Sequence, residues 1–294
     1  MVPGPRSSYN RGTMDRPRIS VCILSFNEEA NIAACIDSVA WCDEVVVVDS
    51  FSRDRTAEIA RQRGARLIQA EWPGFVAQRK RAMEAASGEW VLCLDCDERV
   101  TPRLREAIQA RLGSSHSADG YYISRKLHYL GRWLDHGGWY PEWRLRLFRR
   151  SLAHCVGVDP HDTIHLEGRA ERILPGGSGP DAAVITHHSF SSLSHQLKVL
   201  DRYSEIQAGE LFRSGRRARR SDLMLRPLWR FLWGYLLRLG FLDGSAGYHM
   251  AVNHAYAAYM KYARLWEIQR GLAGARPTSE VVPLSEESRP RVEN

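Results

Sequence analysis

The chain has few cysteines and no long apolar segment among its 294 residues. Its six cysteines are scattered, which excludes the disulfide framework of a small secreted domain. No apolar run reaches the roughly 18–20 residues that a membrane-spanning helix needs, so no span is expected. Residues 1–17 lack the apolar segment of a secretory signal. We therefore expect a cytoplasmic protein with a disordered N-terminus, whose true start is either Met1 or Met14.

The sequence also lacks the glycine-rich loops that hold phosphates through backbone amides. Neither G-x-G-x-x-G nor G-x-x-x-x-G-K follows any expected strand. The absence of both motifs excludes the usual dinucleotide-dependent dehydrogenases and the P-loop nucleotide-binding proteins. A bound phosphate would instead be held by a metal ion or by cationic side chains, for which Arg79 and Lys80 are candidates.

Positive charge is in modest excess and is unevenly distributed. The chain has 41 Lys and Arg against 34 Asp and Glu, a net charge of +7, in an otherwise ordinary globular composition. Residues 198–238 hold ten basic and four acidic residues, so most of the excess lies there. Such a block favours an anionic partner, either nucleic acid or a membrane surface, or else forms a solvated face.

Apolar runs alternate with helical segments over the first hundred residues. The expected strands cover residues 18–25, 44–49, 65–69 and 90–95, and the expected helices cover 28–40, 54–63 and 75–86. Strands that are apolar throughout predict a parallel sheet with helices on both faces. Right-handed crossovers make this half an α/β, Rossmann-like arrangement.

The second half has a different character. From Ala118 the chain consists of short strand-like pieces such as 120–124 and 143–148, aromatic loops and many histidines. The pattern is helical from residue 189 to about residue 270, and residues 271–294 resemble a disordered tail.

Acidic and amide side chains follow three of the expected strands. Asn27 and Glu28 follow the first, Asp49 ends the second, and Asp95 and Asp97 end the fourth. Helix capping could explain Asn27 alone but not the acidic run after residue 94. Ligands bind at the carboxyl ends of parallel strands, and carboxylates without basic neighbours repel one another. We therefore expect this edge to bind a divalent cation.

Three segments carry a resemblance to glycosyltransferase family 2. They are residues 19–28, which end in Phe-Asn-Glu, residues 47–56, and residues 88–98 with their Asp-Cys-Asp sequence. Residues 137–142, 146–148 and 240–244 further resemble the subgroup that adds β-glucose to the lipopolysaccharide inner core. The chain departs from that subgroup at Lys80, where Asn is frequent, and at Asp162, where Glu is usual.

The resemblance implies a GT-A fold with a mostly parallel sheet, an inverting reaction and a Mg²⁺ or Mn²⁺ ion. Glu28 and Asp49 would contact the nucleoside of a UDP-sugar, Asp95 would lie near ribose or metal, and Asp97 would ligate the metal. Residues 18–112 would form the nucleotide-sugar-binding half, residues 113–195 the acceptor-binding half, and residues 196–270 a helical, membrane-associating region.

Glu142 is the candidate general base, because it falls where the family places an acidic residue that faces the acceptor. Arg144 or Arg146 would assist the phosphates, and His161 or His187 could contact sugar or metal. The alternative for Glu142 is a surface ion pair with Arg144 or Arg146. A lone histidine is more often a hydrogen-bonded structural residue.

A basic aromatic segment at residues 226–239 predicts an interfacial helix. Arg226, Arg230, Gly234 and Arg238 step by four and form one polar stripe on an otherwise apolar helix. Packing against the catalytic domain or a second subunit of a homo-oligomer is the alternative. No nucleic-acid-binding module is visible, so nucleic acid is not an expected partner.

Together these features predict an enzyme that moves a sugar, expected to be glucose, from a UDP-sugar to a lipid-anchored glycan such as the lipopolysaccharide inner core. It would act as a peripheral protein on the cytoplasmic face of the inner membrane. The alternatives are transfer to polyprenyl phosphate, exopolysaccharide or protein, and a non-catalytic relative that binds nucleotide or carbohydrate.

Overall fold

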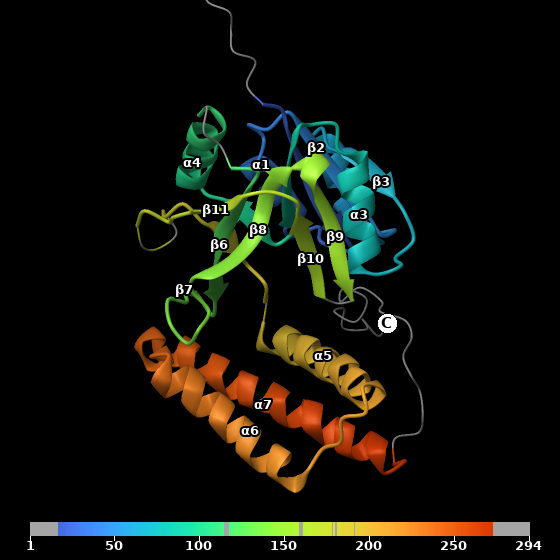
Figure 1. The fold of residues 1–294 in the computed structure, drawn as a ribbon, viewed down its shortest axis with the longest axis vertical. Helices are drawn as coiled ribbons and strands as arrows, with labels where there is room; N and C mark the ends of the chain where they lie inside the picture. The colour runs from blue at the N-terminus through green and yellow to red at the C-terminus, as the bar shows by residue number, and fades with distance from the viewer. Residues whose placement is uncertain are drawn as a thin grey trace, which may run out of the picture.

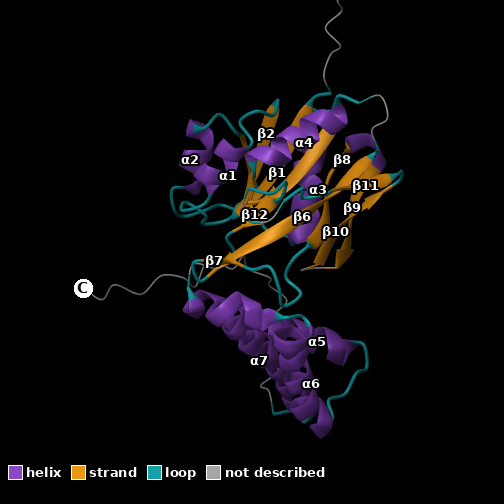
Figure 2. Ribbon diagram, turned by 90° about the vertical axis from the view of Figure 1, so that its left-hand side faces the viewer, coloured by secondary structure: helices purple, strands orange, loops and turns teal. Residues whose placement is uncertain are grey.

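A computed structural model describes residues 17–114, 118–158, 161–177, 179, 181–190 and 192–272, without the side chains of Val158 and His161. Most of the expected N-terminal and C-terminal disordered segments lie outside these ranges. Figures 1 and 2 show a sheet flanked by helices, with a group of long helices packed beneath it. Within the described ranges, none of the helices combines the length and the apolar character that crossing a membrane requires.

Parallel strands and helices alternate in the first half, as the sequence predicts. The elements are β1 (Ile19–Ser25), α1 (Ile32–Ser38), β2 (Glu44–Asp49), α2 (Thr56–Gln62), β3 (Arg66–Gln69), α3 (Phe75–Ala85) and β4 (Trp90–Asp95). The strand order β3–β2–β1–β4 is parallel throughout. The carboxyl ends of β1, β2 and β4 therefore meet at one edge.

Both faces of this sheet are buried. Val21 and Ile23 of β1 pack in a core with α1, α2 and the later helix α4 (Pro102–Leu112), whereas Cys22 and Leu24 pack on the opposite face with α3. Each face is covered by helices, so alternation between polar and apolar residues is absent from the strand. This explains why the run is apolar throughout.

Antiparallel strands extend the sheet in the second half. The further elements are β5 (Glu98–Val100), α4 (Pro102–Leu112), β6 (Gly120–Tyr129), β7 (Arg132–Trp133), β8 (Glu142–Arg149), β9 (Ala153–Val158), β10 (His161–Leu166), β11 (Ala170–Ile173) and β12 (Ile185–His187), with a 3₁₀ turn at Arg150–Leu152. The order continues as β4–β8–β6–β12–β5, and β8 is antiparallel to both β4 and β6. Strands β9 and β10 form a separate hairpin.

A helical unit packs below the sheet (Figure 1). It comprises α5 (Leu193–Arg213), α6 (Arg220–Leu232), a π-helical turn at Trp233–Leu237, a 3₁₀ turn at Gly240–Asp243 and α7 (Gly244–Gln269). Its own small core includes Ala208 of α5, Leu223 of α6 and Leu265 of α7. Tyr129 of β6 connects it to the sheet, because its hydroxyl contacts Gln196 of α5 and Asn253 of α7.

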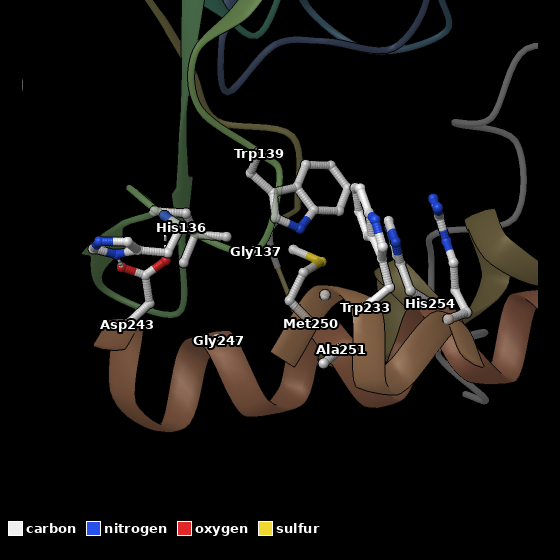
Figure 3. A pocket seen from close by; sticks show the side chains of 12 residues that line it. His136, Gly137, Trp139, Trp233, Asp243, Gly247, Met250, Ala251 and His254 are labelled. Atoms are coloured by element: carbon white, nitrogen blue, oxygen red, sulfur yellow. Dashed lines mark hydrogen bonds and ion pairs between the residues drawn. The ribbon is translucent and has the colours of Figure 1, made fainter. Parts of the chain in front are cut away.

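A second connection joins the loop before β8 to the start of α7 (Figure 3). The buried carboxylate of Asp243 accepts hydrogen bonds from the backbone N–H of His136 at 2.8 Å and pairs with its Nδ1 at 2.9 Å. Gly247 allows close contact at the same joint, since a Cβ there would lie 1.9 Å from the backbone oxygen of Gly240. The glycine-rich segments around residues 137 and 240 thus join the two parts of the molecule.

Candidate active site

The loops after β1 and β2 are organised by Asp49 and Asn27. The fully buried Asp49 accepts from Ser25 Oγ at 3.0 Å and from the backbone N–H of Ser52 at 2.9 Å. Asn27, whose φ is 53°, accepts from the backbone N–H of Arg53 at 2.7 Å. The structure gives both residues a role in shaping these loops, and their contacts with a nucleoside stay predictions.

Glu28 lies in an acidic environment at the same edge. Its carboxylate accepts from Asn31 Nδ2 at 2.9 Å. Burial, with further repulsion from Asp97, Asp54 and Asp95, raises the pKa of Glu28 to about 7. The charges of Asp95 and Asp97 thus reach Glu28, so the first and fourth strand ends share one electrostatic region.

Asp95 and Glu98 are paired with arginines from three other elements. Asp95 accepts from Arg79 Nη2 at 2.6 Å and from Arg146 Nη2 at 2.9 Å. The fully buried Glu98 accepts from Arg146 at 2.6 Å and from Arg125 at 3.0 Å. Burial raises the pKa of Asp95, but the attraction of Arg146 and Arg79 outweighs it and holds that pKa well below its usual range. The expectation that these carboxylates lack basic neighbours is therefore wrong, because α3, β6 and β8 supply arginines.

The two candidate phosphate-binding residues of α3 have different environments. Arg79 is 2% exposed and pairs with Asp162 at 3.0 Å as well as with Asp95. The Lys80 side chain is 66% exposed, and its ammonium lies 3.8 Å from Glu84 on the same helix. The structure thus gives Lys80 no contact with the acidic strand ends. Arg79 supports Asp95, and its contact with a phosphate stays a prediction.

Asp97 and His187 form the part of the site that best suits a metal ion. His187 Nε2 of β12 lies 3.2 Å from Asp97 Oδ2, and both side chains are mostly buried. Burial opposes ionisation of both groups, but their mutual attraction leaves the pKa of Asp97 lowered and that of His187 raised. Within the described ranges, no three His, Cys, Asp or Glu side chains converge to enclose a metal ion by themselves. Two protein ligands fit an open site in which substrate phosphates and water supply the remaining oxygens.

Glu142, the first residue of β8, is paired with two arginines. Arg125 Nη2 lies 2.8 Å from its Oε2 and Arg144 Nη2 lies 2.8 Å from its Oε1. Burial raises the pKa of Glu142, but the arginines outweigh it and leave that pKa below the usual value. The ion pair with Arg144 that the sequence offered as an alternative is therefore present. Arg144 is 54% exposed and can reach a ligand, whereas Arg146 is 10% exposed and is bound to Asp95 and to the buried Glu98.

A cleft of about 910 Å³ separates this edge of the sheet from the helical unit. Glu142, Arg125 and His187 lie on its sheet side, residues of α5, α6 and α7 line the opposite side, and loop residues such as Trp139 and Phe190 complete the lining. Because His187 contacts Asp97, the cleft leads from the helical unit to the acidic strand ends. A ligand in the cleft could therefore reach both the candidate base and the candidate metal ligands.

Sequence reasoning missed Arg125 and gave His187 little weight. Arg125 reaches Glu142 only because β6 and β8 pair in a register that places the two residues opposite each other. No local motif marks that antiparallel pairing. The structure does not describe the side chain of His161, so its expected role is left untested.

Comparisons with known proteins agree with this arrangement. A family model described as "Glycosyl transferase family 2" matches residues 20–165. The uncharacterized glycosyltransferase RT0209 of Rickettsia typhi is 30% identical over 85% of this chain and 87% of its own length. The chain belongs to glycosyltransferase family 2. Another relative, the lipopolysaccharide core biosynthesis glycosyltransferase LpsC of Rhizobium meliloti, is 29% identical over 88% of this chain and 95% of its own length.

Solved structures resemble the chain only in part. Glucosyl-3-phosphoglycerate synthase from Mycobacterium tuberculosis, in complex with Mn²⁺, UDP and glucosyl-3-phosphoglycerate, is 27% identical over 38% of this chain, with a TM-score of 0.33. The alignment covers 44% of that synthase. This overlap is too small to inform the substrate of the present transferase.

Proposed function

We propose that this family 2 glycosyltransferase is a metal-dependent, inverting enzyme that transfers a sugar from a UDP-sugar to a lipid-anchored glycan. One observation carries the proposal: Asp97 and His187 lie 3.2 Å apart beside a cleft that also contains Glu142. A donor diphosphate at Asp97 and an acceptor in the cleft would meet between these residues.

The donor half of the reaction needs charge compensation for the leaving diphosphate. Asp97 and His187 would hold Mg²⁺ or Mn²⁺, which when bound neutralises negative charge on the phosphates. Arg144 has an exposed guanidinium at the cleft and is suited to approach the same oxygens. Glu28 and Asp49 would position the nucleoside through the loops after β1 and β2.

Glu142 is proposed as the general base that accepts the proton of the acceptor hydroxyl. Arg125 and Arg144 keep it ionised, which is the state a base requires, although a lowered pKa also weakens the pull on the proton. Glu142→Gln should lower the transfer rate by about 10²–10⁴-fold, the usual contribution of general base catalysis.

The control for that variant separates proton transfer from ion pairing. Arg144→Gln removes one partner of Glu142 and should cost less activity, and Glu142→Gln should bind UDP like the wild type. Unchanged transfer kinetics in Glu142→Gln would refute the assignment.

The lipopolysaccharide core is the proposed acceptor, with glucose as the proposed sugar. The supporting relative is LpsC, whose name assigns it to lipopolysaccharide core biosynthesis. A membrane-bound acceptor also agrees with the apolar surface of the helical unit. Its exposed side chains outside the cleft include Met224, Leu228, Leu236, Leu237, Phe241 and Leu242. We propose that this surface binds the cytoplasmic face of the inner membrane peripherally.

The decisive experiment measures thermal stabilisation by UDP with and without Mn²⁺, in the wild type and in Asp97→Ala. Binding to the native state raises stability by RT ln(1 + [L]/Kd), so saturating UDP should raise the Tm clearly. A metal-dependent shift in the wild type that is lost in Asp97→Ala supports the donor site. No shift under either condition would overturn the nucleotide-sugar proposal.

A further inference from the structure

Three cations gather on the helical side of the cleft. Arg226 and Arg230 of α6 and Lys261 of α7 all line it. The Arg226 guanidinium lies 4.8 Å from the ring centre of Tyr262, and the Lys261 ammonium lies 5.2 Å from the same centre. Because both cations lie against one ring, they belong to a single site contributed by two helices.

The positive charge of this cluster is only partly compensated. Asp222 pairs with Arg226 at 2.5 Å, and it also lies 3.9 Å from Arg216 outside the cleft. Within the described part of the chain, no carboxylate lies within ion-pair distance of Arg230 or Lys261. Burial and then the repulsion of Arg226 and Arg230 lower the pKa of Lys261, which is the response expected of a cation in a positive field.

The rest of the cleft does not supply the missing negative charge. Among the described residues that line it, the one carboxylate is that of Glu142, which Arg125 and Arg144 already neutralise. The remaining lining is largely aromatic or neutral and includes Trp139 and His254, whose rings are 4.5 Å apart. Burial lowers the pKa of His254 to about 4, so it adds no charge near neutral pH.

We propose that Arg226, Arg230 and Lys261 bind a phosphomonoester on the acceptor glycan. The cluster leaves about two positive charges uncompensated, which matches the charge of −1.5 to −2 that a phosphomonoester carries at pH 7. A single carboxylate would neutralise only half of it. Aromatic side chains beside the cations suit the sugar ring that carries the phosphate, and the opposite side of the cleft holds Glu142 for the hydroxyl.

This inference rests on the proposed function, because it assigns the cleft to the acceptor. Its test uses the full-length protein without metal and measures binding of glucose 6-phosphate, glucuronate and glucose by calorimetry. Glucose 6-phosphate should bind more tightly than glucuronate, and glucose should bind least. Arg230→Gln and Lys261→Met should each weaken glucose 6-phosphate binding by about tenfold, in line with the loss of one charge-assisted contact.

Arg220→Gln is the matched control, since Arg220 is an exposed arginine of α6 that does not line the cleft. It should bind glucose 6-phosphate like the wild type. Both cleft variants should also keep or increase their Tm without ligand, because each removes a repelling charge. Equal affinity of the wild type for glucose 6-phosphate and glucose would overturn the inference, as would variants that bind the phosphate unchanged.

UDP binding with Mn²⁺ separates this site from the donor site. The cleft variants should retain it fully, and a parallel loss of UDP binding would show that the cations serve the donor phosphates and would overturn the inference. Absence of UDP binding in the wild type would refute the proposed function alone, because phosphate binding by the cluster is measured independently. Weaker binding of phosphatidylglycerol vesicles with unchanged glucose 6-phosphate binding would assign the cations to a lipid headgroup and contradict the inference.

Discussion

At the residue scale, the acidic strand ends differ in how their charge is compensated. Asp95 and Glu98 are neutralised internally by arginines, whereas Asp97 meets only His187 at ion-pair distance among the described residues. A buried ion pair loses hydration that its attraction must offset, so Asp95 is stabilised only while its guanidinium partners are in place. Asp97 is consequently the better ligand for an incoming cation.

Glu28 gives a pH-dependent prediction at the same scale. Its pKa in the folded state is about 7, above the ordinary value of 4.5, so the folded protein binds its proton more tightly than the unfolded chain. The contribution to stability is full below pH 4.5 and is lost as the pH rises through 7. Glu28→Gln mimics the protonated form and should raise the free energy of unfolding at pH 8 by about 1–3 kcal/mol, allowing for partial exposure.

The measurement is urea unfolding of the metal-free protein between pH 5 and 8. The increase in the free energy of unfolding that Glu28→Gln gives over the wild type should become smaller toward pH 5. Glu106→Gln on the exposed side of α4 is the control and should show no such trend. The prediction would be contradicted if the free energy of unfolding of Glu28→Gln differed from that of the wild type by the same amount at pH 5 and at pH 8.

At the scale of elements, the parallel half of the fold follows from local patterns. The run at residues 90–95 is β4 with the expected bounds, and 44–49 is β2, because these strands are buried on both faces. The first helix is shorter than expected, beginning at Ile32 instead of Glu28, because residues 28–31 form the turn that carries Glu28 and Asn31.

The site was less predictable because its cations come from remote strands and helices. Arg146 reaches Asp95 only through the antiparallel pairing of β8 with β4. Arg226 and Arg230 were expected to form a polar stripe, but their position at the cleft depends on how α6 packs against α7. Neither pairing nor packing has a local signature in the sequence.

The joint at Gly247 gives a prediction about elements. Gly247→Ala should lower the free energy of unfolding by about 1–3 kcal/mol or more, because its Cβ would lie 1.9 Å from the Gly240 oxygen and force the 3₁₀ turn away from α7. Gly209→Ala in α5 is the matched control. Nothing lies within 4 Å of a Cβ there, and alanine in a helix should stabilise by about 0.5–1 kcal/mol.

Urea unfolding followed by circular dichroism compares the two variants. If Gly247→Ala lowers the free energy of unfolding and Gly209→Ala raises it, the result supports a close-packed contact at Gly247. Equal effects would mean that helix propensity alone governs both positions.

At the scale of the whole molecule, the helical unit has a side that lines the cleft and a side with exposed apolar residues. Arg226 and Arg230 line the cleft toward the sheet, while Met224 and Leu228 of the same helix are 73% and 55% exposed. This division suits an enzyme that takes its acceptor from a surface against which the helices lie. The helical unit would then place the cleft close to the glycan at the membrane surface.

The corresponding prediction concerns vesicles that contain phosphatidylglycerol. Replacing both Met224 and Leu228 by serine should lower the affinity for these vesicles on the order of tenfold, because less apolar surface is then transferred from water into the membrane. Leu174→Ser is the control, because Leu174 is 68% exposed but lies after β11, outside the helical unit. Co-sedimentation measures the bound fraction, and UDP-dependent stabilisation should stay as in the wild type. If the double variant binds vesicles normally but changes from dimer to monomer in sedimentation velocity, the apolar surface is a subunit interface and the membrane assignment is wrong.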